Sequence, residues 1–315
     1  MVPAPPDVAR RQAASSGRPI PYEQTRARYP DTTGFVERDG VRVFYEVYGA
    51  GEPTVLCLPT WSIAHSRIWK LQIPDLARRF RVIAFDPRGN GRSDRPTNIE
   101  AYAEAEFAAD ALAVMDATAT KQAVLVSLSL GAHRALVLAS DHPERVAGAV
   151  FIGPAVPLGS SIPDRAPARR FTERLDTDAG WAKYNSHYWR RDYRGFLEFF
   201  FEQSFSEAHS TKPIDDAVAW GQETDAESLI LTTLSDGLPD REAVLDRCAR
   251  IRCPVLVIHG TDDRIQAHAN GAELARATAG HFVGIDGGGH IPNVREPVLV
   301  NLLIRDFVRR VGTRG

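Results

Sequence analysis

A serine that lies between a predicted strand and a predicted helix is the first candidate for chemistry in this sequence. Ser129 stands in the run VSLSLG at residues 126–131, a variant of the G-x-S-x-G elbow with Ser127 in the first glycine position. Such an elbow exposes its central side chain at the carboxyl edge of a sheet. The following helix N-terminus offers N–H groups to a developing oxyanion. A simple helix N-cap is the alternative, but the strand before and the helix after favour a nucleophile.

A serine nucleophile needs a general base, and nine histidines compete for that role. His290 follows three glycines at 287–289 and the last predicted strand, so its loop can bring the imidazole over the elbow. His133 lies one helical turn beyond Ser129 and is the rival. On a helix its side chain would project from the flank, so we expect a packing or surface role for it. His259 ends a predicted strand and is expected to be packed.

A second motif follows another predicted strand. Residues 86–93 read DPRGNGRS, which matches the pattern D-x-R-G-x-G-x-S. With the elbow, this turn resembles the α/β-hydrolase family, over about residues 34–312. The segment at 58–69 together with the turn resembles hydrolase modules of GC-rich bacteria. The resemblance implies a structural turn, in which Asp86 and Arg88 anchor the backbone and take no part in chemistry.

The resemblance also implies where the acid of the triad lies. The family carries it at the last position of G-x-x-D after a late strand, which here assigns Asp263. Asp262 is the neighbouring alternative. Residues 153–155, after an earlier strand, contain no carboxylate, and this strengthens the later position. The chain order Ser129, Asp263, His290 is that of α/β hydrolases.

An oxyanion hole needs two backbone N–H groups. Leu130, directly after the nucleophile, should supply one of them. In relatives the second comes from the loop after the strand that here ends near residue 58. Pro59 has no N–H to donate, so Trp61 is the expected donor. Thr60 occupies a position where relatives usually have glycine.

Predicted strands alternate with predicted helices along most of the chain. The alternation predicts an α/β fold, with a mostly parallel sheet flanked by helices and an inserted, mainly helical cap. We expect an N-terminal arm at 1–33, a core at 34–155 and 247–315, and the cap at 156–246. The predicted strands are 35–38, 41–48, 54–58, 81–85, 123–126, 147–152, 254–258 and 281–285, and the predicted helices lie near 69–80, 108–115, 130–140, 272–277 and 297–311.

The cap segment is rich in aromatic residues. Ten of the chain's 27 aromatic residues lie between residues 181 and 205. Most should fill the cap's own core, while some should roof a pocket over the elbow. Such a pocket favours an apolar or aromatic substrate.

Composition excludes several classes of protein. The net charge of −2 and the pI of about 6.5 provide no basic surface for nucleic acid. No run approaches the roughly 20 apolar residues of a membrane span. Three cysteines cannot form a disulfide framework, which favours a reducing, cytoplasmic compartment. We expect a small-molecule substrate and no metal, cofactor, nucleic acid or membrane partner.

These features predict a serine hydrolase that cleaves a carboxylic ester, lactone or thioester through an acyl-enzyme. Ser129 at the elbow argues against dehalogenases and epoxide hydrolases of this fold, which carry aspartate there. A carbon–carbon bond hydrolase or a perhydrolase on the same triad is the alternative among enzymes. A ligand-binding regulatory module with a slow triad is the alternative outside them.

Overall fold

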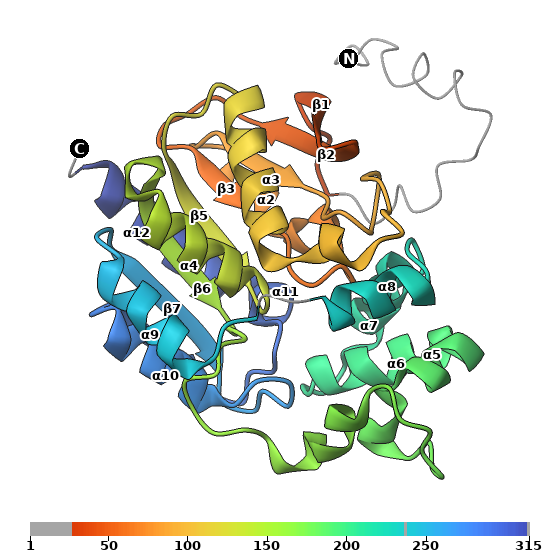
Figure 1. Ribbon diagram of the computed structural model, residues 1–315. Helices are drawn as coiled ribbons and strands as arrows, with labels where there is room; N and C mark the ends of the chain where they lie inside the picture. Colours follow the sequence, from red (N-terminus) through yellow and green to blue (C-terminus); the bar gives the residue numbers. More distant parts are fainter. Residues whose placement is uncertain (1–26, 236–237, 314–315) are drawn as a thin grey trace, which may run out of the picture.

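The computed structural model describes residues 27–235 and 238–313, and an eight-stranded sheet runs through its centre (Figure 1). The strand order is β1-β2-β4-β3-β5-β6-β7-β8. The pairs β1–β2 and β2–β4 are antiparallel, and all other pairs are parallel, so the predicted mostly parallel sheet is confirmed. The strands are β1 (Thr32–Arg38), β2 (Val41–Tyr48), β3 (Val55–Cys57), β4 (Val82–Phe85), β5 (Ala123–Leu128), β6 (Val146–Ile152), β7 (Val255–Gly260) and β8 (His281–Ile285).

The sheet opens with the predicted hairpin. Asp39 and Gly40 have φ values of 54° and 77°, the left-handed backbone that a tight two-residue turn between antiparallel strands requires. β1 begins at Thr32, two residues before the predicted start of the core. Most of the predicted N-terminal arm, residues 1–26, lies outside the described residues.

The central strands are apolar throughout because both faces of the sheet are covered. Alternate side chains of a strand point to opposite faces. Val124 and Val126 therefore join one hydrophobic core, and Leu125 joins the other. Figure 1 shows α3, α4, α9 and α10 on one face and α12 on the other. The core helices are α2 (Ile73–Leu76), α3 (Glu104–Ala117), α4 (Gly131–Asp141), α9 (Arg241–Arg250), α10 (His268–Ala277), α11 (Pro292–Arg295) and α12 (Pro297–Gly312).

One predicted helix is much shorter than its apolar spacing suggests. Where we expected a helix near 69–80, the chain forms a 3₁₀ turn, η2 (Ser66–Trp69), and then the four-residue α2. Proline fits only the first turn of an α-helix. Pro74 is the second residue of α2, so the helix cannot extend backward to Trp69.

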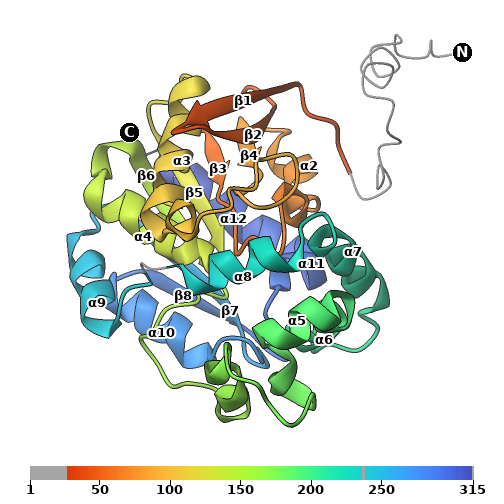
Figure 2. The ribbon, with the colours of Figure 1, turned by 45° about the vertical axis from the view of Figure 1, so that its right-hand side comes forward.

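The segment between β6 and β7 contains no strand in its described residues. It begins with the 3₁₀ turns η5 (Pro163–Arg170) and η6 (Gly180–Lys183), and Figures 1 and 2 show the helices α5 to α8 gathered at one end of the sheet. These helices are α5 (Ser186–Arg191), α6 (Tyr193–Ser204), α7 (Thr211–Gly221) and α8 (Ala226–Leu234). α9 crosses the expected boundary at residue 246. It contacts α4, where Arg247 pairs with Asp141 at 2.7 Å.

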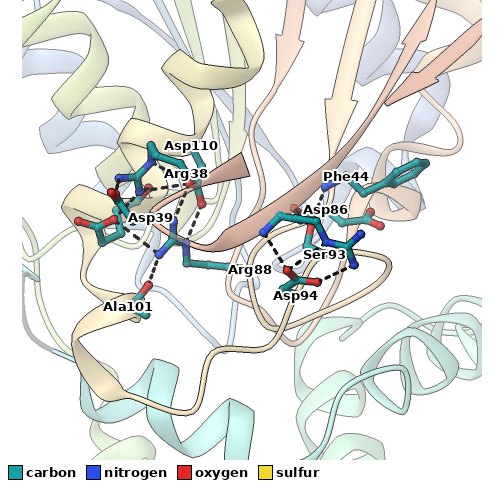
Figure 3. A network of polar contacts seen from close by, with 11 residues as sticks. Arg38, Asp39, Phe44, Asp86, Arg88, Ser93, Asp94, Ala101 and Asp110 are labelled. Atoms are coloured by element: carbon teal, nitrogen blue, oxygen red, sulfur yellow. Dashed lines mark hydrogen bonds and ion pairs between the residues drawn. The ribbon is translucent and has the colours of Figure 1, made fainter. Parts of the chain in front are cut away.

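The turn at residues 86–93 is held by buried polar contacts (Figure 3). Arg88 binds Asp110 of α3 through two nitrogens, at 2.7 Å and 2.6 Å, and both side chains are almost fully buried. Asp86 accepts the backbone N–H of Ser66 at 3.1 Å and that of Arg92 at 2.9 Å. The predicted anchoring role of Asp86 and Arg88 is therefore confirmed. The contacts tie this turn to the loop after β3, which leads into the candidate site.

None of the described helices is both long enough and apolar enough to cross a bilayer.

The buried ion pair generates a stability prediction. Arg88→Met leaves Asp110 buried with only the longer contact to Arg38, so we expect the free energy of unfolding to fall by about 3 kcal/mol. Arg42→Met is the matched control, because Arg42 pairs with Asp94 at an exposed position and should cost at most about 1 kcal/mol. Urea unfolding followed by circular dichroism measures both. Equal losses in the two variants would contradict the assigned role of the buried pair.

Candidate active site

Ser129 has the strained backbone of a nucleophile elbow. It lies between the end of β5 and the start of α4, with a φ of 53° that is rare for a residue with a Cβ atom. Crowding around Ser129 explains why the residues at positions 127 and 131 are small. A Cβ atom at Gly131 would lie 2.8 Å from the carbonyl oxygen of Pro59 and 3.5 Å from Cβ of Ser127. Position 131 therefore requires glycine, and position 127 accepts only a small side chain.

The end of β6 brings Ser129 and His290 to the same place. The amide of Ser129 donates to the carbonyl of Ile152 at 3.0 Å, and its carbonyl accepts the amide of Ala155 at 3.1 Å. Between these contacts lies Gly153, where a Cβ atom would be 2.8 Å from the carbonyl oxygen and 3.2 Å from Nδ1 of His290. Ser129 Oγ has no hydrogen bond within the described part of the chain. Catalytic contacts are often loose until substrate binds.

Asp263 and His290 form a buried pair. Nδ1 of His290 lies 2.7 Å from Oδ2 of Asp263, and only 3% of the His290 side chain is exposed. A carboxylate accepts hydrogen bonds and cannot donate one. Nδ1 must therefore carry the proton in the neutral imidazole, which leaves Nε2 free to accept one. This is the tautomer that a general base requires.

Three further N–H groups bind the same carboxylate. Oδ1 of Asp263 accepts the backbone amides of Ile265 at 2.7 Å and Gln266 at 2.8 Å, and Oδ2 also contacts Nε2 of His259 at 2.9 Å. Burial would raise the pKa of Asp263, but the charge of His290 and hydrogen bonds from both imidazoles outweigh burial and hold this pKa far below its usual range. The ionised form of the carboxylate is therefore favoured.

The contact from His259 is the part of this arrangement that the sequence did not reveal. We expected His259 to be packed, and its side chain is indeed fully buried, but it binds the predicted triad acid. A buried imidazole needs a hydrogen-bond partner. That rule, applied to a histidine at the end of a central strand, is the signal that could have indicated it.

Asp262 turns away from this centre. Its side chain is exposed and pairs with Arg264 at 3.3 Å, while its amide donates to the carbonyl of Gly288 at 2.9 Å. The glycines before His290 allow this close approach. A Cβ atom at Gly260 would lie 2.1 Å from the carbonyl oxygen of Gly288, so the two loops are in backbone contact. Of the two aspartates, only Asp263 meets His290.

The loop after β3 is oriented by a buried arginine of α4. Nη1 of Arg134 binds the carbonyl oxygens of Pro59 at 2.7 Å and Thr60 at 2.5 Å. In a planar trans peptide the C=O and N–H groups point in opposite directions. The amide of Trp61 therefore points away from Arg134. Within the described residues, the amides of Trp61 and Leu130 have no acceptor.

His133 is packed, as expected. Its side chain is buried against the backbone of Ala155, and burial lowers the pKa of its imidazole. No group of three or more His, Cys, Asp or Glu residues in ranges 27–235 and 238–313 could hold a metal ion.

Aromatic rings of the insert cover Trp61. Its indole ring lies 5.5–6.3 Å, between ring centroids, from the rings of Tyr184, Trp189, Phe196 and Phe200. Its Nε1 donates to Oγ1 of Thr232 in α8 at 2.9 Å. The insert therefore covers Trp61 and with it the loop after β3.

Comparison with known proteins decides the family. Residues 53–297, more than half of the chain, match the family model of the alpha/beta hydrolase fold. The chain belongs to the α/β-hydrolase family. The α/β hydrolase is 29% identical over 280 residues to a Variovorax paradoxus protein named "Putative carbamate hydrolase RutD", which covers 86% of this chain and 97% of that protein.

Two further similarities involve different hydrolytic reactions. 2-Hydroxymuconate semialdehyde hydrolase of Pseudomonas sp. strain CF600 is 36% identical over 148 residues, 45% of this chain and 47% of that protein. The solved structure of Est816, described as an N-acyl homoserine lactone degrading enzyme, is 28% identical, with a TM-score of 0.71. That alignment covers 87% of this α/β hydrolase and all of Est816.

The environment of the two aspartates generates a prediction. Asp263→Asn should lower kcat/KM by about 10⁴-fold. An amide has one acceptor oxygen to offer the four N–H groups around Asp263, and it cannot stabilise an imidazolium. Asp262→Asn is the matched control and should cost little because its side chain is exposed. Hydrolysis of a 4-nitrophenyl ester by folded, purified variants measures both. If Asp262→Asn lost more activity than Asp263→Asn, Asp262 would be the acid of the triad.

The two histidines near the elbow generate a second prediction. A general base must be unprotonated, and histidine changes charge between about pH 5 and 8. For a neutral ester, kcat/KM should therefore fall at the acid end of that range. His290→Ala should remove most activity together with this acid limb, whereas His133→Ala should keep the limb.

Circular dichroism at each pH excludes unfolding as the cause of the activity loss. An acid limb that persists in His290→Ala and vanishes in His133→Ala would identify the helix histidine as the base.

Proposed function

We propose that this α/β hydrolase is a serine hydrolase that cleaves a carboxylic ester through an acyl-enzyme. The observation that carries the proposal is the surroundings of Ser129. Ser129 has a left-handed backbone, and the loop that contains Trp61 approaches the turn after Ser129 at Gly131. Among the described residues, the amides of Trp61 and Leu130 have no acceptor. The amide and carbonyl of Ser129 bind Ile152 and Ala155, and His290, which is paired with Asp263, lies against Gly153 between them.

In the proposed reaction, Nε2 of His290 accepts the proton of Ser129 Oγ as the oxygen attacks the ester carbonyl. The amides of Trp61 and Leu130 stabilise the oxyanion, and the carboxylate of Asp263 stabilises the imidazolium. His290 then protonates the leaving alcohol. Water, activated by the same imidazole, attacks the acyl-enzyme and releases the acid.

We further propose that residues 156–240 form the cap of the active site, with α9 belonging to the core. The aromatic rings packed around Trp61 support the cap, and the contact of α9 with α4 supports the placing of α9 in the core. They favour a substrate with an apolar or aromatic part next to the scissile carbonyl. The free thiols of Cys57, Cys248 and Cys253 favour a reducing, cytoplasmic setting.

A lactone is a cyclic ester that needs no change in these roles, and the similarity to Est816 supports including it. The similarity to the Pseudomonas semialdehyde hydrolase supports carbon–carbon bond cleavage as the second candidate. Aryl esters of varied acyl length, lactones and vinylogous diketones therefore belong in one substrate panel.

The nucleophile generates the test of the proposal. Ser129→Ala should lower kcat by about 10⁶-fold, because the members of a triad act as a unit. It should also abolish labelling by a fluorophosphonate probe. Ser127→Gly is the matched control and should retain activity, because position 127 needs only a small side chain. A Ser129→Ala variant with substantial turnover would refute the assignment. A wild-type protein that stays unlabelled but binds small molecules tightly would indicate a binding module.

A further inference from the structure

A cavity of about 280 Å³ lies between the start of the insert and the loop after β7. On the insert side it is lined by Ser160, Ser161, Ile162, Arg165, Ala168, Arg169 and Tyr184. On the core side it is lined by Ile265, Gln266 and Asn270. The triad roles proposed above use no side chain that lines this cavity.

The side chain of Arg165 contributes a positive charge to the cavity. Arg165 has no ion pair within the described residues, and Nη1 donates to the carbonyl oxygen of Ile265. Its guanidinium lies 4.5 Å from the centroid of the Trp181 ring, which fixes its plane. Nε is buried and has no hydrogen-bond partner among those residues. A buried, unpaired donor on a charged group is costly unless a ligand binds it.

Further polar side chains line the cavity together with Arg165. Gln266 accepts a hydrogen bond from Asn270 at 3.3 Å through Oε1, which leaves its amide NH₂ as a free donor within the described chain. Arg169 lies at the exposed rim of the cavity and has no ion pair there. Burial lowers the pKa of Arg165, while Tyr184 and Asp263 act in the opposite direction, so the guanidinium would gain from a negative neighbour.

Some residues that line the cavity also contact residues of the proposed active site. Ile265 and Gln266 line the cavity and, through their amides, hold Oδ1 of Asp263. Tyr184 lines the cavity, and its ring lies 5.8 Å from that of Trp61, the proposed oxyanion donor. The cavity is therefore adjacent to residues that contact Asp263 and Trp61.

We propose that this cavity is a subsite that binds a carboxylate of the substrate through Arg165. The proposal rests on the proposed function and names its substrate class: esters or lactones whose acyl chain carries a second, ionised carboxyl group. A guanidinium has the planar fork that binds a carboxylate through two parallel hydrogen bonds. One half-buried positive charge matches one negative charge, and Tyr184, which lines the cavity next to Trp61, would contact the chain between the two carbonyl groups.

The experiment compares two chromogenic substrates of equal length. One is the mono-4-nitrophenyl ester of adipic acid, and the other is 4-nitrophenyl hexanoate, which ends in a methyl group. The measured quantity is the ratio of their kcat/KM values. In Arg165→Gln we expect this ratio to fall by about 10- to 100-fold, the loss typical of a hydrogen bond to a charged group. Arg165→Lys keeps the charge without the fork and should restore part of the ratio.

Arg174→Gln is the matched control. It removes the same charge from an exposed arginine of the same segment that does not line the cavity, and should leave the ratio unchanged. Equal losses on both substrates in Arg165→Gln and Arg165→Lys would mean that Arg165 is only structural, and would overturn the proposal. An equal fall of the ratio in Arg174→Gln would indicate a general effect of net charge and would also overturn it.

A binding measurement separates this proposal from the proposed function. Calorimetric titration of adipate into Ser129→Ala should detect binding that weakens at least tenfold when Arg165→Gln is added. If adipate binding depends on Arg165 but no ester hydrolysis depends on Ser129, the subsite stands and the proposed function fails. If hydrolysis depends on Ser129 while neither the ratio nor adipate binding depends on Arg165, only the subsite fails.

Discussion

The buried carboxylate of Asp263 is the group around which this part of the molecule is organised. An ionised carboxylate in a protein interior is tolerated only when donors surround it. Two come from its own loop, at Ile265 and Gln266, and two from the imidazoles of His259 and His290. These four contacts join the end of β7, the following loop and the loop after β8. The carboxylate therefore fixes the position of His290 as much as it fixes the proton on that ring.

The parallel sheet supplies the place where these loops meet. In an open α/β sheet, ligands bind outside the carboxyl ends of the strands. Ser129 follows the end of β5 and Gly153 follows the end of β6, while the loops of Asp263 and His290 follow β7 and β8. The loop after β3 completes the group because Arg134 of α4 holds its carbonyls. The helix α4 thus follows Ser129 and also orients the loop after β3.

The insert contributes a different kind of surface. Over Trp61 it is aromatic, and the packing of these rings leaves little freedom for their neighbours. Beside the loop after β7 it provides Arg165 in a polar cavity. Apolar rings next to one positive charge would select substrates by their apolar chain and by a second, ionised carboxyl group away from the reacting carbonyl. The core carries the proposed chemistry, and the insert carries the proposed selection.

Much of this protein was predictable from local sequence. The strands, the hairpin at Asp39-Gly40 and the elbow at Ser129 depend on apolar periodicity and on turn chemistry between neighbouring residues. The glycines before His290 also indicated a loop that can bring the imidazole over the elbow. The helix expected near 69–80 failed for a local reason as well, because Pro74 restricts where an α-helix can begin.

Only the tertiary structure decided which distant groups share one partner. His259 and His290 lie 31 positions apart and bind one oxygen of Asp263, and Arg134 binds carbonyls 74 and 75 positions away. Apolar periodicity specifies which face of an element is buried, but a hydrogen bond depends on distances of a few tenths of an ångström between separate elements. Packing, and not spacing along the chain, decides which aromatic rings surround Trp61. It also decides that Arg165 forms no ion pair with another described residue.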